Sequence, residues 1–407
     1  MRRVTDVQTP DAPAGSQRPP GGPSRDPRPG LSGLEPDVLS AWFADRSEPL
    51  YRARQVADAV WAGGAGGAAS AAEVRTLPAA LREAVDRAFR LDTLTDTELQ
   101  PGDGGQTVKA LHRLSDGALV ESVLMHYPAR GANRERNTVC ISSQAGCAVG
   151  CPFCATGELG FTRDLETAEI VDQVRNAARR LTAAGRRLTN VVFMGMGEPL
   201  LNLDRVLEAL TALSDPSRFG LGARHITVST SGVVPGMRRL TGLGPQFTLA
   251  VSLHAARDPL RDVLVPLNRR WPVAEVVAAA RDHAETTGRR ISYEVTLIDG
   301  VNDTPADADA MAELLRGDLC HVNLIPMNLV AHTPWQASPI DRIERFAARL
   351  RRDRIAVTIR RNRGQEIGAA CGQLAAERAG EPAGPVVARR RELLVRESAA
   401  ALRAVGG

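Results

Sequence analysis

Hydrophobic and polar residues alternate along this chain with two different periods, and the change of period separates predicted strands from predicted helices. From Thr138 onward, short apolar runs are followed by stretches whose apolar residues recur every three to four positions. The predicted strands are TVCIS, NVVFMG, HITVST, FTLAVSLH, ISYEVTLI and HVNLIPM, and the predicted helices lie near 165–184, 203–213 and 234–241 and in VAEVVAAARDHAETT. Six strands that alternate with helices predict an α/β fold, a parallel sheet that curves into a partial (βα)6 barrel.

The first third of the chain follows a different pattern. Three stretches between Leu39 and Leu91, LSAWFADR, YRARQVADAVWAG and LPAALREAVDRAF, have helical spacing and predict a small helical domain. Between Glu98 and Tyr127 the apolar residues alternate with polar ones, as in TVKALHRL and ALVESVLMHY, and Asp116-Gly117 marks a hairpin turn. We expect a short β-ribbon there.

These patterns divide the chain into five parts. Residues 1–30 are crowded with Pro, Gly, Ser and Arg and predict a disordered leader. The other parts are a helical accessory domain over 31–97, a β-ribbon linker over 98–137, the barrel with a C-terminal loop over 138–374, and a charged helical tail over 375–407. Because active sites of such barrels lie at the carboxyl ends of the strands, we expect the chemistry in the segments that follow them.

Composition narrows the class of protein. With 407 residues, 43% hydrophobic and 24% charged, the chain is typical of globular proteins. No uncharged apolar run reaches the roughly 18 residues of a membrane helix, and the first 30 residues lack the apolar core of a secretory signal. We therefore expect a cytoplasmic protein without a membrane partner. The net charge of +4 is too small to indicate nucleic-acid binding by itself.

The strongest chemical signal is the CxxxCxxC spacing of Cys147, Cys151 and Cys154, just after the first barrel strand. Three converging thiolates suit a soft metal or an iron–sulfur cluster. A structural zinc site is the alternative, but it normally takes four ligands, and no fourth Cys or His follows nearby. Three cysteines leave one iron of a [4Fe–4S] cluster open to a small molecule.

These motifs resemble the radical S-adenosylmethionine (SAM) enzymes, whose signature is CxxxCxxC after the first strand of a partial (βα)6 barrel. The runs TVCISSQAGCAVGCPFCATG, NVVFMGMGEPLLN, ITVSTSGVVPG, AVSLHA, VNLIPMN and RGQEIGAACGQL are similar to those of the RlmN family of adenosine C2-methyltransferases, from about Leu39 to Leu374. The resemblance implies a [4Fe–4S] cluster held by Cys147, Cys151 and Cys154, and two SAM molecules per turnover.

The same resemblance implies covalent catalysis by cysteine. Cys371, in AACGQL, matches the cysteine that carries the methyl group to C2. Cys140, in TVCIS, matches the cysteine that attacks the Cys371 sulfur and releases the RNA through a transient disulfide. Glu121, in LVESV, matches the general base that removes the C2 proton. Taken alone, the two cysteines would be assigned to the core and Glu121 to a solvent-facing strand position; we assign Cys320 to the core.

The family also implies a set of SAM-binding residues at the strand ends. They match Gly197, Glu198, Ser229, Ser252, Leu253, His254 and Asn328. Taken one by one, the glycine could form a turn and the polar residues could cap strand ends.

Substrates follow from the resemblance as well. Family members methylate an adenosine in the peptidyl-transferase centre of 23S rRNA and the adenosine 3′ of the anticodon in certain tRNAs, both in loops where a base can be unstacked. Arg360, Arg361 and Arg363 are candidates for phosphate contacts, or form a solvated strand end. We expect a monomer that takes electrons from a donor such as flavodoxin or ferredoxin. The alternatives are a Cfr-like enzyme that methylates adenine C8, and a non-catalytic Fe–S protein that senses redox state while it binds RNA.

Overall fold

The computed structural model describes residues 25–131, 134–244, 246–330, 333, 335–375 and the single residues 389, 392 and 396. The predicted leader up to residue 24 and nearly all of the predicted tail over 375–407 lie outside the described residues. Residues 25–30, assigned to the disordered leader, are described and have defined partners: Gly30 pairs with Arg90 in a parallel bridge, and the Arg90 N–H donates to the Pro29 carbonyl at 2.9 Å. These six residues are therefore part of the folded protein.

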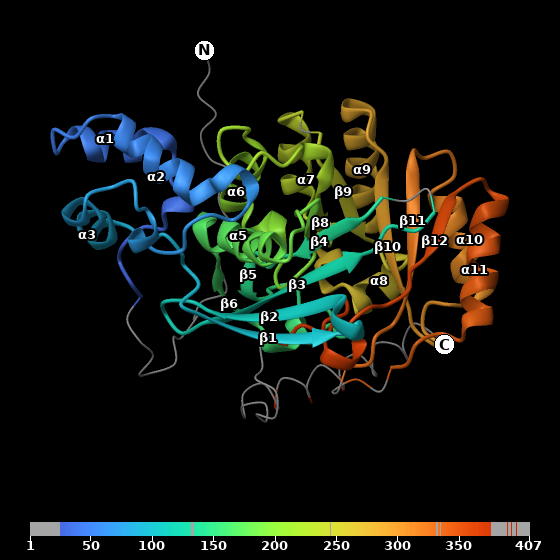
Figure 1. Ribbon diagram of the computed structural model, residues 1–407. Helices are drawn as coiled ribbons and strands as arrows, with labels where there is room; N and C mark the ends of the chain where they lie inside the picture. The colour runs from blue at the N-terminus through green and yellow to red at the C-terminus, as the bar shows by residue number, and fades with distance from the viewer. Residues whose placement is uncertain are drawn as a thin grey trace, which may run out of the picture.

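One ten-stranded sheet organises the molecule (Figure 1). In spatial order its strands are β1 (Asp96–Gly102), β2 (Thr107–Arg113), β3 (Leu119–Tyr127), β4 (Arg136–Cys140), β7 (Asn190–Phe193), β8 (Ile226–Thr230), β9 (Thr248–Ser252), β10 (Ile291–Leu297), β11 (Cys320–Pro326) and β12 (Ala356–Ile359). Neighbours from β4 to β12 are all parallel. The six predicted barrel strands are confirmed, and β12 adds a seventh strand that the sequence analysis did not predict.

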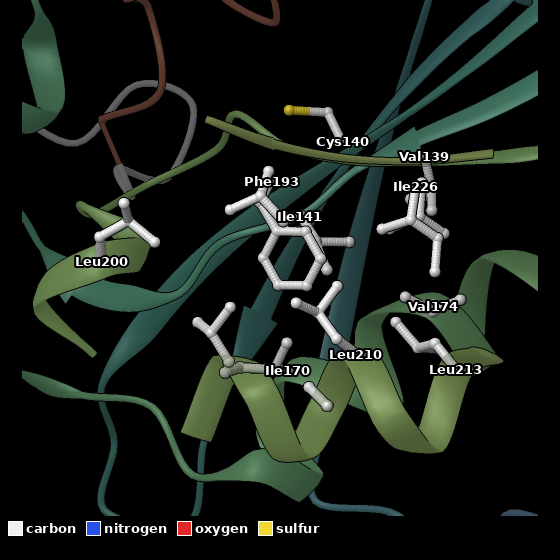
Figure 2. Packing of buried hydrophobic residues seen from close by; sticks show 14 of the residues in the cluster. Val139, Cys140, Ile141, Ile170, Val174, Phe193, Leu200, Leu210, Leu213 and Ile226 are labelled. Atoms are coloured by element: carbon white, nitrogen blue, oxygen red, sulfur yellow. The ribbon is translucent and has the colours of Figure 1, made fainter. Parts of the chain in front are cut away.

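Helices connect the parallel strands, as the βα rhythm predicts. They are α5 (Thr167–Ala183), α6 (Leu203–Ser214), α7 (Val234–Gly242), α8 (Asp258–Leu264), α9 (Val273–Thr287), α10 (Pro305–Leu314) and α11 (Ile340–Arg352). Phe193 of β7 and Ile141, which directly follows β4, are buried and pack toward Leu210 of α6, whereas the Cys140 side chain points to the other side of the sheet (Figure 2). In the described ranges, no helix is both long and apolar enough to span a bilayer.

The predicted β-ribbon is continuous with the barrel sheet. Strands β1, β2 and β3 pair antiparallel, and the Leu114 N–H donates to the Ala118 carbonyl at 2.9 Å to close the Asp116-Gly117 turn. Strand β3 then pairs antiparallel with β4, and Val123 lies opposite Cys140. Because directly opposite residues share a face of the sheet, and residues two apart on a strand also do, Glu121 lies on the same face as Cys140.

The three predicted N-terminal helices are confirmed as α1 (Pro36–Ala44), α2 (Tyr51–Trp61) and α3 (Ala79–Ala88), at the opposite end of the molecule from α10 and α11 (Figure 1). Two buried charges of α5 fasten this segment to the barrel. Arg175 donates to the carbonyls of Leu91 at 2.7 Å and Ala68 at 2.5 Å. Asp172 accepts hydrogen bonds from the Ser32 hydroxyl and pairs with Arg175 at 2.6 Å.

We expect Asp172→Ala to lower the free energy of unfolding by about 3–5 kcal/mol, because it leaves the wholly buried Arg175 cation without its counter-charge. Urea unfolding followed by circular dichroism measures this loss. Arg345→Ala is the control, since it breaks an exposed ion pair with Asp341 and should leave the midpoint nearly unchanged. Equal midpoints for Asp172→Ala and the wild type would contradict this account of the docking.

Candidate active site

An open cavity lies at the carboxyl ends of the parallel strands. Its wall receives residues from the segments at or after β4, β7, β8, β9, β10, β11 and β12. The predicted site residues that line it are Cys147, Cys151, Cys154, Gly197, Glu198, Ser229, Ser252, His254, Asn328 and Cys371. Glu121, Cys140 and Leu253 do not line it. Most of the predicted site residues therefore meet at the carboxyl ends of the strands, where a fold of this kind predicts the active site.

A small hairpin shapes the three-cysteine loop. Strands β5 (Gln144–Gly146) and β6 (Phe161–Asp164) pair antiparallel, and the Cys147 N–H donates to the Gly160 carbonyl at 2.8 Å. Gly146 has a φ of +77°, and a Cβ there would lie 1.8 Å from the Gly160 oxygen. Only glycine allows this closure, which gathers all three cysteines in one short loop.

The surroundings of the three thiols fit an iron–sulfur cluster. Cys147, Cys151 and Cys154 pack with Val149 and Phe153 in one apolar cluster. Burial raises the pKa of each thiol, to about 12 for Cys147, so a metal cation is needed to favour the thiolates. In the part of the chain that the structure describes, no three Cys, His, Asp or Glu side chains could hold a single metal ion. The donor set is soft sulfur alone, and it faces an open cavity.

Glu198 is held at the end of β7 by backbone groups. Its N–H donates to the Gln144 side chain at 2.9 Å, and its carboxylate accepts from the N–H groups of Leu200 at 3.1 Å and Ser231 at 2.7 Å. Gly197 has a φ of +98°, and a Cβ there would lie 2.5 Å from the Gln144 Cβ. Burial raises the pKa of Glu198, although these hydrogen bonds favour its anion.

His254 is fixed as a neutral hydrogen-bond donor. The Thr296 N–H donates to Nδ1 at 3.1 Å, so the single ring proton of the neutral imidazole is on Nε2. Burial lowers the pKa of His254 to about 3, with a smaller contribution from Arg261. The residue has a φ of +59° and its ring lies 4.8 Å from that of Phe153, beside the cysteine loop. Such a strained backbone often accompanies a functional position.

The other predicted residues at these strand ends have distinct surroundings. The Ser229 hydroxyl donates to the Phe193 carbonyl at 2.5 Å, and its oxygen retains acceptor capacity toward the cavity. Ser252 reaches the wall, whereas Leu253 is buried behind it. The Leu253 N–H donates to the Glu294 carbonyl at 3.0 Å, which fixes the backbone between Ser252 and His254.

Cys371 is brought to the cavity by a loop that follows β12. The Asn328 amide donates to the Cys371 carbonyl at 2.9 Å and accepts from Gln365 at 2.7 Å. From the other side, the Ala155 N–H donates to the Gly372 carbonyl at 2.7 Å. Cys371 is exposed. A thiol distant in sequence from the CxxxCxxC loop is therefore held beside it.

Cys140 and Glu121 lie behind the cavity wall. Burial raises the pKa of the Cys140 thiol, and the nearby Cys371 raises it further. Glu121 is also buried, and the Lys109 ammonium, the only lysine of the chain, lies 3.1 Å from its Oε1. The structure thus brings Cys140 near Cys371, and it places Glu121 on the Cys140 face of the sheet, paired with Lys109.

Sequence reasoning missed one charged residue of the cavity wall, Glu294, and did not predict that Arg360 also lines the cavity. Glu294 accepts hydrogen bonds from Ser292 at 2.9 Å and Asn323 at 2.8 Å, and the Arg360 guanidinium lies 3.6 Å from its second oxygen. A carboxylate inside an otherwise apolar predicted strand was the available signal for Glu294. Arg360, considered for phosphate contacts, lines the cavity with Cys371.

Comparisons with known proteins agree with this site. The family model for the radical SAM superfamily matches residues 141–315. A probable dual-specificity RNA methyltransferase RlmN from Parafrankia sp. (strain EAN1pec) is 53% identical over 88% of this chain and 94% of the relative. Its counterpart from Thermobifida fusca (strain YX) is 49% identical over 87% of this chain and 97% of the relative. The crystal structure of a radical SAM methyltransferase from Sphaerobacter thermophilus superimposes with a TM-score of 0.82 at 46% identity, over 86% of this chain and all of that one.

The matches extend over nearly the whole length of these relatives, and the three-cysteine loop, the Glu198 segment and the Cys371 loop converge on one cavity. The chain therefore belongs to the RlmN family of radical SAM RNA methyltransferases.

Proposed function

We propose that this enzyme methylates C2 of adenosine in 23S rRNA, at the peptidyl-transferase centre, and in tRNA, at the position 3′ of the anticodon. The observation that carries the proposal is the position of Cys371, which lines the same cavity as the three-cysteine loop and has Cys140 behind it. A cysteine so placed is suited to carry a carbon unit to a substrate atom. The names of the family members, dual-specificity RNA methyltransferases, support an RNA substrate.

In this proposal Cys147, Cys151 and Cys154 hold a [4Fe–4S] cluster. When bound, the cluster and two SAM molecules per turnover supply the methyl group and the hydrogen-atom abstraction that activates it. In the proposal the Glu198 carboxylate accepts hydrogen bonds from the SAM amino group and the His254 Nε2–H donates one, a role supported by the position of both residues on the cavity wall. Ser229 and Ser252 add hydroxyls to the same wall, and Leu253 contributes through its backbone.

Three residues share the covalent part of the reaction. Cys371 carries the methyl-derived carbon and is bonded through it to adenine C2 in the adduct. Glu121 accepts the C2 proton. The Cys140 thiol then loses its proton and attacks the Cys371 sulfur: a disulfide forms, the bond from that sulfur to the transferred carbon breaks, and the carbon keeps the electron pair and takes up a proton to become the methyl group. The external reductant returns the disulfide to two thiols. Asn328 acts as a positioning residue, because its amide fixes the Cys371 loop.

Arginines beside the Cys371 loop support a nucleic-acid substrate. The guanidinium groups of Arg136 and Arg363 lie 4.2 and 4.3 Å from the centre of the Tyr127 ring. Arg363 also donates to the His126 carbonyl at 2.9 Å. Fixed guanidinium groups of this kind suit phosphates of an unstacked RNA loop. An RNA substrate of this kind implies a cytoplasmic enzyme, and reduction by a donor such as flavodoxin or ferredoxin completes the scheme.

Nucleoside mass spectrometry tests the proposal directly. Anaerobically reconstituted enzyme, SAM and a reductant are incubated with unmodified 23S rRNA fragment and with unmodified tRNA. We expect 2-methyladenosine in both RNAs. An 8-methyladenosine product would show that the enzyme methylates C8 of adenine and not C2. Cleavage of SAM without any methylated nucleoside would refute the RNA substrate.

Cys371→Ala should abolish methylation, because no sulfur remains to carry the methyl-derived carbon. The measurement is the yield of 2-methyladenosine together with the iron content of the reconstituted variant. Cys320→Ala is the control, since Cys320 is buried in β11 and does not line the cavity. Turnover by Cys371→Ala near the wild-type rate would refute the covalent route.

Cys140→Ala should accumulate a covalent protein–RNA adduct, because the bond to the base still forms and cannot be resolved by a disulfide. A denaturing gel with labelled RNA detects the adduct as a slow band that is absent from Cys371→Ala and from the double variant. Multiple turnover by Cys140→Ala without any such band would assign the resolving step to another group.

A further inference from the structure

Arg261 of α8 is a buried cation that no part of the proposed reaction uses. Its guanidinium makes four hydrogen bonds: Nε to the Leu253 carbonyl at 2.9 Å, Nη1 to Asn268 Oδ1 at 2.8 Å, and Nη2 to the carbonyls of Ser231 at 2.7 Å and Ser252 at 3.1 Å. The side chain is fully buried. It therefore joins the ends of β8 and β9, where Ser231 and Ser252 line the cavity.

The charge of Arg261 is only indirectly compensated. Within the described residues, no carboxylate lies within ion-pair distance of its guanidinium. Asp258 and Asp262 are separated from it by the Asn268 amide, which donates to them at 3.0 and 2.6 Å. Burial lowers the pKa of Arg261 to about 10, so the side chain is still a cation at neutral pH. A buried charge without a direct ion-pair partner is costly.

Apolar side chains connect the helix of Arg261 to the three-cysteine loop. Leu260 and Leu264, on either side of Arg261 in α8, belong to the apolar cluster against which Cys147, Cys151 and Cys154 pack. Glu198, whose carboxylate accepts from the Ser231 N–H, is the anion on the other side of the Ser231 peptide.

We propose that Arg261 is a positioning residue whose charge also sets the reduction potential of the iron–sulfur cluster, an inference that rests on the cluster of the proposed function. One electron from an external low-potential donor adds one negative charge to the cluster, and no bond is made or broken. A buried cation behind the cysteines stabilises the reduced form because charges interact strongly where water is excluded. The positive charge of Arg261 thereby raises the reduction potential of the cluster, so that a given donor reduces a larger fraction of it.

The test is an electron paramagnetic resonance titration of the reconstituted, SAM-free enzyme poised with dithionite. Arg261→Gln should shift the midpoint to a more negative potential, with about a tenfold lower ratio of reduced to oxidised cluster at a fixed poise, which is roughly 59 mV for one electron. Arg261→Lys keeps the charge and loses the guanidinium fork, so its midpoint should stay near that of the wild type while its affinity for SAM falls.

Two further variants separate the electrostatic effect from a loss of fold. Arg175→Gln removes another fully buried arginine, one that bonds to the carbonyls of the helical segment, and it should leave the midpoint unchanged. Asp262→Asn removes a nearby negative charge and should shift the midpoint in the positive direction. If Arg261→Gln does not fold, the midpoint potential of Asp262→Asn tests whether charge near Arg261 changes the potential of the cluster.

The proposal is wrong if the wild type and Arg261→Gln have equal midpoints, or if the Gln and Lys variants shift the midpoint equally. Arg261 would then have a structural role alone. An unchanged midpoint in Asp262→Asn would also overturn the proposal, as would a wild-type chain that binds no cluster. A wild-type chain that shows the predicted midpoint differences but does not methylate RNA would refute the proposed function and leave this inference standing.

Discussion

The active site depends on the hydrogen bonds that attach the end of the barrel to its beginning. The Ala155 N–H donates to the Gly372 carbonyl at 2.7 Å, and the Thr156 hydroxyl donates to the Leu374 carbonyl at the same distance. Residues 155 and 156 directly follow Cys154. The distance between the three-cysteine loop and Cys371 is thus fixed by backbone geometry, and a covalent carrier needs this precision because small displacements are costly in rate.

Charged side chains also fix the relative positions of the segments around the site. Arg175 fastens the helical segment, and Arg261 joins two strand ends. Arg360, which is only partly buried, lies beside Glu294 on the cavity wall, with its guanidinium 3.6 Å from the carboxylate. Arg175 and Arg261 are expensive to bury, and each donates four hydrogen bonds, mostly to backbone carbonyls. These side chains specify one arrangement of the strand ends, because any other arrangement would leave a cation without partners.

Much of the fold was predictable from local periodicity. The apolar spacing of VAEVVAAARDHAETT predicts a helix with the bounds of α9, and the six apolar runs are strands. Strand β12 was missed because its four residues, AVTI, alternate between exposed and half-buried positions and pair with only one neighbour. Residues 25–30 were assigned to the leader by composition, which does not reveal the partner that Arg90 provides.

Some residues of the site could likewise be predicted from the sequence, and others could not. The CxxxCxxC spacing and the segments around Glu198, His254 and Cys371 are short motifs, so the sequence could indicate them. Arg261 was not predictable, because its partners are backbone carbonyls of other segments, and the only signal for Glu294 was a carboxylate inside a predicted strand. Nor could the sequence show that the Asn328 amide holds the Cys371 loop on both its oxygen and its nitrogen.

The bond between Thr156 and Leu374 spans 218 positions of sequence, and this separation has a consequence for biosynthesis. At about 5–20 residues per second, a ribosome needs roughly 10–40 s to travel from one partner to the other. For most of that interval the segment that holds Cys371 beside the cysteine loop has not been made. The nascent chain therefore passes through a stage at which the cysteine loop lacks the hydrogen bonds that join residues 155 and 156 to residues 372 and 374.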